Sequence, residues 1–173
     1  KLTQTKGSEY IILSNTSGII VDSIKLNYAN QTNHSRGRTT NGAATWAVFD
    51  SPTLNAANIN AKTKYANKVT FNFQPGFYTG AQSITLSTTE PSASIRYTIN
   101  GSVPTTASNL YSGPINVSAT TVIRARAYST NPLVLSSHTE TNTYFINEVH
   151  SVKVISVCGN SVANLFNGSQ TEP

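Results

Sequence analysis

Apolar and polar residues alternate along short stretches of this chain, and clusters of Gly, Pro, Asn and Ser separate the stretches. Such a period of two is typical of β-strands, because successive side chains on a strand point to opposite faces. The spacing of three and four residues that marks an amphipathic helix occurs only weakly, at 162–166. In the second half of the chain the pattern predicts strands at 69–73, 82–88, 94–99, 121–128 and 141–146.

Two of these predicted strands carry arginine on the face opposite to their apolar side chains. In the first, Arg96 lies opposite an apolar series that ends with Ile99. In the second, Arg124, Arg126 and Tyr128 lie opposite the apolar side chains. Short strands at regular spacing, with turn signals between them, predict a β-sandwich with arginine on its outer face.

The first half of the chain predicts a hairpin, a short strand and an irregular stretch. Residues 9–14 and 18–26 flank the turn signal "NTSG", with Gly18 at the position that needs a positive φ. The pair Asn41-Gly42 signals a second turn before the short strand "TWAVF". Residues 50–60 are predicted to be irregular.

The composition fits exposed faces of antiparallel sheets. The chain has 173 residues and is 38% hydrophobic, enough for one ordinary domain or two small ones. Charged residues make up only 11%, and Ser, Thr and Asn replace them. The net charge is 12 − 7 = +5, but the basic residues are scattered, so we expect no nucleic-acid partner.

Reactive side chains are sparse, and we expect no catalytic residue, no cofactor and no metal. The single cysteine, Cys158, excludes an internal disulfide and a thiolate zinc site, and it is predicted to be a buried, inert thiol. The three histidines lie far apart, and no two carboxylates form a sequence pair for glycosidase chemistry. No run is long enough to span a membrane. Because the chain has no methionine, we expect it to be a piece of a longer protein.

The stretch "YTINGSVPTTASNLYSGPI" carries a resemblance to a known family. It is similar to the family pattern Y-T-x-D-G-S-x-P-T…L-Y-x-G-P-I of the immunoglobulin-like module at the C-terminus of chitobiase and β-hexosaminidase-type proteins. The resemblance covers about residues 69–147 and implies an immunoglobulin-like β-sandwich there. Asn100 stands where the family usually has Asp, which weakens a calcium-binding interpretation of that turn.

Two further resemblances flank this module. Residues 1–60, with "SGIIVDSI" and "GRTTNGAATWAVFDSPT", resemble the latter part of a bacterial lamin-tail domain, and 61–68 are then a linker. Residues 148–173, with "HSVKVISVCGNSVANLF", resemble the start of a CotH-type kinase region. Together they imply an all-β fold of tandem immunoglobulin-like β-sandwiches, the first one incomplete, followed by the beginning of another domain.

The incomplete first sandwich poses a physical problem. Its apolar face, formed by Ile11, Leu13, Ile20 and Ile24, lacks the partner sheet that a sandwich needs. Domains of about 60 residues are marginal even when complete. We therefore expect that further strands or another chain cover this face, or that the segment is partly disordered.

Aromatic and arginine side chains are the candidate binding residues. Trp46 is expected in the core, with a sugar-stacking platform as the alternative. Tyr78, Tyr111 and Tyr128 are expected to cap loops through their hydroxyls or, alternatively, to stack on sugars. Arg96, Arg124 and Arg126 form either a solvated face or a docking patch for an acidic polysaccharide or a neighbouring domain.

These observations predict a non-catalytic, extracellular or cell-surface spacer and interaction region of a large bacterial protein. The expected partners are other domains of the same protein or a larger surface assembly. The alternatives are a carbohydrate-binding module, with polysaccharide as the ligand, and an accessory arm of a CotH-type kinase.

Overall fold

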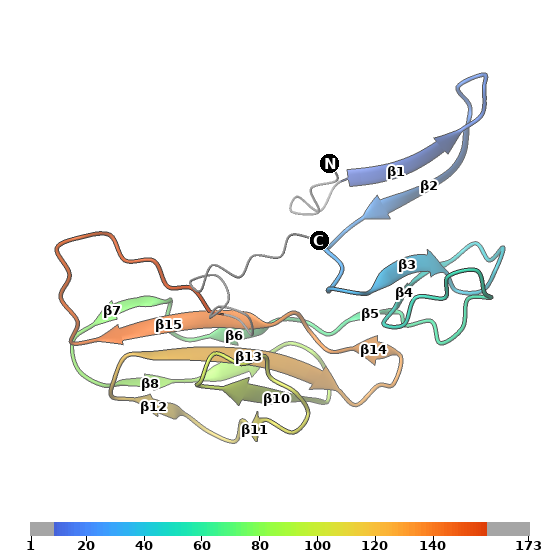
Figure 1. Cartoon of the computed structure of the whole chain (residues 1–173). Coiled ribbons are helices and arrows are strands. Elements are labelled where there is room, and N and C mark those ends of the chain that lie inside the picture. The colour runs from blue at the N-terminus through green and yellow to red at the C-terminus, as the bar shows by residue number, and fades with distance from the viewer. Residues whose placement is uncertain (1–8, 159–173) are drawn as a thin grey trace. The chain divides into compact units, whose positions relative to one another are not determined.

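A computed structural model describes residues 9–158, which form fifteen β-strands and no helix (Figure 1). The prediction of an all-β fold is therefore confirmed. The chain divides between Lys64 and Tyr65 into two compact units, called unit 1 and unit 2 below, and the short strand β5 (Lys64–Tyr65) spans the division. No helix in this part of the chain is long and apolar enough to cross a membrane.

Unit 1 contains two antiparallel pairs. Strand β1 (Glu9–Ser14) pairs with β2 (Ile20–Leu26), and β3 (Ser35–Arg38) pairs with β4 (Trp46–Phe49). The predicted turn between the first two strands is present, with Gly18 at φ 79°. The small core of unit 1 consists of Ile24, Leu26, Ala47, Val48 and Phe49.

The β1–β2 hairpin carries apolar side chains on both faces. Ile11, Leu13 and Ile20, predicted to share a face without a partner, are 47%, 62% and 59% exposed. Ile20 is not on that face, because a register shift pairs it with Ser14, which lies on the same side of the hairpin as Ile12. Ile24 departs from that prediction, because it is 9% exposed and belongs to the core. On the opposite face Ile12 is also 53% exposed. What covers these side chains stays a prediction.

Unit 2 is built around a five-stranded sheet. Its strand order is β11-β10-β13-β15-β7, antiparallel except that β15 and β7 run parallel. The bounds are β7 (Gly76–Tyr78), β10 (Ala93–Thr98), β11 (Asn109–Leu110), β13 (Thr121–Ser129) and β15 (Glu140–Ile146). Strand β13 is the centre of this sheet, with β10 on one side and β15 on the other.

Shorter strands form the second layer. β6 (Val69–Phe71) pairs with β9 (Leu86–Thr88), and β8 (Gln82–Ile84) pairs with β12 (Ile115–Val117). The remaining short strand is β14 (Val134–Leu135). The core contains Val69, Ile84, Leu86 and Val117 of this layer and Ile95, Ile123, Ala125, Ala127, Tyr144 and Ile146 of the five-stranded sheet. Two layers with a shared apolar core make unit 2 a β-sandwich of immunoglobulin-like type.

Three sequence predictions need correction in unit 2. The strand predicted at 82–88 is two strands, because Thr85 leaves one ladder and exchanges backbone and side-chain hydrogen bonds with Asn72. Ile99 is 54% exposed rather than inside, because β10 ends at Thr98. The run 152–157 forms no strand, so Cys158 is half-buried rather than buried.

Candidate functional site

The loop at residues 99–108 is held on the outer face of the five-stranded sheet. Arg96 on β10 donates through Nη1 to the carbonyl of Ser108 at 3.1 Å. Arg124 on β13 donates through Nη1 to the carbonyl of Gly101 at 2.8 Å. The Tyr128 hydroxyl, further along β13, donates to the carbonyl of Pro104 at 2.8 Å. Three outward side chains therefore satisfy three carbonyls of one loop.

The loop also stabilises itself by local contacts. Pro104 is fully buried, so the loop has an apolar anchor beside its polar ones. The side-chain oxygen of Asn100 accepts from the backbone N–H of Ser102 at 3.1 Å and from its hydroxyl at 2.7 Å, and Gly101 has φ 80°. This Asx-turn needs only a short side-chain acceptor, so Asn serves as well as Asp at this position.

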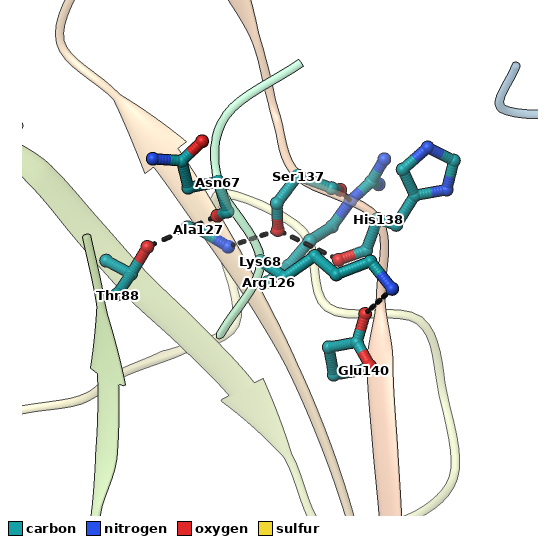
Figure 2. A network of polar contacts seen from close by, with 8 residues as sticks. All are labelled: Asn67, Lys68, Thr88, Arg126, Ala127, Ser137, His138 and Glu140. Carbon is teal, nitrogen blue, oxygen red and sulfur yellow. Dashed lines mark hydrogen bonds and ion pairs between the residues drawn. The ribbon is translucent and has the colours of Figure 1, made fainter. Parts of the chain in front are cut away.

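The third outward arginine holds another segment. Figure 2 shows Arg126, which donates through Nε to the carbonyl of Ser137 at 2.7 Å. Ser137 is itself fully buried, and its hydroxyl accepts from the N–H of Ala127 at 2.9 Å and donates to the carbonyl of His138 at 2.8 Å. A serine side chain thus takes the place of a strand partner beside β13.

Further polar contacts in Figure 2 join the start of unit 2 to its sheets. Lys68 and Glu140 form an ion pair with a separation of 3.0 Å. The Thr88 hydroxyl donates to the carbonyl of Asn67 at 3.2 Å. Outside the figure, the buried Glu90 accepts from the N–H of Asn67 at 3.0 Å. These contacts position backbone and offer no convergent acid and base for catalysis.

Arginine has the same role in unit 1. Arg36 donates to the carbonyl of Tyr28 at 2.8 Å and lies 4.1 Å from the centre of its ring. Arg38 donates to the carbonyl of Ala44 at 2.6 Å and lies 4.3 Å from the ring centre of Trp46. Trp46 is half-buried, and Arg38 lies against its ring, which leaves less of that ring for a sugar. All five arginines of the chain, Arg36, Arg38, Arg96, Arg124 and Arg126, donate to a backbone carbonyl.

The remaining predicted aromatic residues are half-buried. The Tyr78 hydroxyl donates to the carbonyl of Gln74 at 2.6 Å, and Tyr111 meets the edge of Tyr97 with ring centres 6.5 Å apart. Both Tyr78 and Tyr111 pack against the core of unit 2. The hydroxyls of Tyr78 and Tyr128 form the bonds that loop capping predicts. Ligand binding at Trp46, at the three tyrosines and at the arginine face stays a prediction.

Asp22 and Tyr144 have pKa values that depart from their ordinary ones. A hydrogen bond and ion pair from Arg38 lower the pKa of Asp22, with help from the N–H of Ser23. Burial raises the pKa of Tyr144, whose hydroxyl donates to the carbonyl of Phe73 at 3.0 Å. Neither group lies in a cluster of reactive side chains. Residues 9–158 contain no group of three or more His, Cys, Asp or Glu side chains placed to bind a metal.

The comparisons with known proteins concern unit 2. No curated protein and no solved structure matches the chain significantly. Residues 73–144 match the family model of the Chitobiase/beta-hexosaminidase C-terminal domain. This range lies inside the 69–147 predicted from the sequence. The resemblances of residues 1–60 to a lamin-tail domain and of 148–173 to a CotH-type region stay predictions, and 159–173 lie outside the described residues. Unit 2 is thus similar, over most of its sandwich, to the immunoglobulin-like C-terminal module of chitobiase and β-hexosaminidase.

Proposed function

We propose that this chain is a non-catalytic, extracellular spacer and interaction region of a larger secreted or cell-surface protein. Its β-sandwich would hold a neighbouring domain of the same protein, or of a surface assembly, at a fixed distance. The observation that carries this proposal is the use of arginine. Each of the five guanidinium groups holds a backbone carbonyl of its own chain, so the cationic side chains contribute to a rigid shape.

The alternative role of Arg96, Arg124 and Arg126 as a docking patch makes a different prediction. If they mainly hold loops, each change to Ser lowers the free energy of unfolding of unit 2, by about 1–2 kcal/mol, because a carbonyl loses a charged donor. If they mainly dock, the changes weaken association with anionic glycans or a neighbouring domain and leave stability unchanged. Urea unfolding and a glycan array distinguish the two.

The control for these variants is Lys153→Ser. It removes the same charge from an exposed side chain, and we expect its free energy of unfolding to stay within about 0.5 kcal/mol of the parent chain. Arginine variants as stable as this control would contradict the spacer proposal.

A carbohydrate-binding accessory module is the second candidate. It is favoured by the family match, because chitobiase and β-hexosaminidase are names of sugar hydrolases. Loss of glycan binding in Tyr111→Ala or Tyr128→Ala would support sugar binding at these tyrosines. The third candidate, an accessory arm of a CotH-type kinase, depends on sequence beyond Pro173, and reading the full-length gene tests it.

A further inference from the structure

A groove of about 640 Å³ lies on unit 2. Its floor is formed by β7 and β15, which lie next to each other in the five-stranded sheet. Its other wall is the segment at 154–158. A hydrogen bond of 2.7 Å between the hydroxyls of Thr143 on β15 and Ser156 joins the floor to this wall. The volume falls in the range of about 300–1,000 Å³ that is usual for small-molecule sites.

Two aromatic rings form the apolar part of the groove. Phe77 on β7 and Phe145 on β15 are paired in register, and their rings stack with centres 4.6 Å apart and planes 17° apart. His150 meets the edge of Phe77 at 5.8 Å. Phe77 is nevertheless 51% exposed. A flat, half-exposed aromatic surface is therefore fixed at the edge of a rigid sheet.

The rest of the lining is uncharged. The groove is lined by Pro75, Gly76, Phe77, Thr141, Thr143, Phe145, Val154, Ser156, Val157 and Cys158. Its polar side chains apart from the thiol are all hydroxyls, although the chain as a whole carries a charge of +5. Arg124 donates to the hydroxyl of Thr141 at 3.3 Å, but the same guanidinium group is bonded to the carbonyl of Gly101 at 2.8 Å. The lining itself has no charged side chain, so it matches a ligand without charge.

Because the groove is open to solvent, it favours an uncharged ligand that also has polar groups to keep in water. A purely apolar ligand would keep much of its surface in water above the half-exposed Phe77. A sugar ring has one apolar face for the aromatic surface and hydroxyl edges that stay hydrated or bond to Thr and Ser. We propose that this groove binds a neutral oligosaccharide, with a pyranose ring stacked on Phe77 and the hydroxyls of Thr143 and Ser156 beside it. This inference rests on the second candidate function and moves its site away from the predicted tyrosines.

Binding is tested first on the full chain by calorimetry with soluble hexasaccharides. At least one of maltohexaose, cellohexaose and chitohexaose should bind, whereas anionic hexagalacturonate should not. Phe77→Ala should weaken binding about tenfold, and Phe77→Tyr, which keeps the ring, should retain it. Leu110→Ala is the matched control, because Leu110 is also 51% exposed and lies on β11 at the opposite edge of the same sheet. Absence of binding by all three neutral sugars, or equal weakening by Leu110→Ala, would overturn the proposal.

The location is tested through the one cysteine of the chain, Cys158, which lines the groove. A bound oligosaccharide should slow the alkylation of Cys158 by a maleimide severalfold in the parent chain. It should do the same in Tyr128→Phe, which changes a tyrosine predicted from the sequence to bind sugar. A sugar concentration near the Kd of the parent chain should slow the reaction far less in Phe77→Ala. A sugar that binds without changing the rate binds elsewhere, which overturns this site and leaves the second candidate function intact. The spacer proposal, tested by unfolding of the arginine variants, is independent of both results.

Discussion

At the scale of single residues, arginine carries much of the polar structure. A guanidinium group combines a long apolar stem with several fixed donors, so it can lie along a sheet and still reach a loop carbonyl. In unit 1, Arg38 does this while it covers the Trp46 ring and pairs with Asp22. Arg124 does the same in unit 2, where it also donates through Nε to the hydroxyl of Thr141 at 3.3 Å.

The pair of Arg38 and Asp22 gives a prediction about pH. Arg38→Gln should raise the pKa of Asp22 back toward its ordinary value of 3.8, because the largest cause of its lowering is the hydrogen bond from Arg38. In the parent chain the folded pKa lies below the unfolded one. The pair therefore stabilises unit 1 above pH 3.8, and this contribution is lost as the pH falls through the lowered pKa.

Carboxyl chemical shifts of Asp22 measured by NMR against pH test this prediction. Arg36→Gln is the control, since Arg36 lies on the same strand but bonds to Tyr28 and Asn30. An Asp22 pKa that is the same in Arg38→Gln as in the parent chain would show that the pair has no energetic effect. Because both side chains are partly exposed, added salt should reduce the difference.

At the scale of elements, unit 2 shows how a residue outside any strand satisfies the backbone of its central strand. Strand β13 pairs with β10 along six residues, but its pairing with β15 ends at Ala125. Beyond that point Ser137 supplies both its N–H, to the carbonyl of Ala127 at 2.9 Å, and its hydroxyl, which accepts from the N–H of Ala127. The backbone groups of a central strand thus stay satisfied where the neighbouring strand has not yet begun.

We therefore expect Ser137→Ala to destabilise unit 2. The change leaves the buried N–H of Ala127 and the carbonyl of His138 without the hydroxyl, at a cost of about 1–3 kcal/mol in the free energy of unfolding. Urea unfolding followed by tyrosine fluorescence measures it. Ser118→Ala, at an exposed position, should have almost no effect. A loss in Ser137→Ala no larger than in Ser118→Ala would mean that water replaces the hydroxyl.

At the scale of the whole molecule, the two units differ in how much apolar surface each buries. Among residues 9–158, the core of unit 2 has eleven buried residues, whereas the buried apolar residues of unit 1 are Ile24, Leu26, Ala47, Val48 and Phe49. In unit 1 the β1–β2 hairpin adds several exposed apolar side chains. Because burial of apolar surface is the main stabilising contribution in folding, the two units should differ in stability.

Hydrogen exchange of the full chain tests this difference. Amides of β13 should exchange slowest, because this strand pairs on both sides and Ile123, Ala125 and Ala127 are fully buried. Amides of β1 should exchange much faster, since it pairs only with β2 and its side chains are exposed. Equal protection of β1 and β13 in the isolated chain would contradict the prediction. A partner that covers the hairpin should raise protection in β1 and β2 and leave that of β13 unchanged.

The sequence by itself determined the local secondary structure and the all-β fold class. Alternation predicted β10, β13 and β15, and turn chemistry predicted the hairpin at Gly18, because both depend on neighbours within a few residues. The motif at 97–115 also identified the module that the family model matches at 73–144. The motif did not reveal that the loop at residues 99–108 is held by side chains from β10 and β13.

Only the tertiary structure decided which distant residues meet. Phe77 and Phe145 stack because β7 and β15 pair in parallel, and no local pattern specifies a pairing across so long a separation. For the same reason the sequence left Arg96, Arg124 and Arg126 as either a solvated face or a docking patch. Their carbonyl partners lie 11 to 23 residues away along the chain, and folding alone brings them within hydrogen-bonding distance.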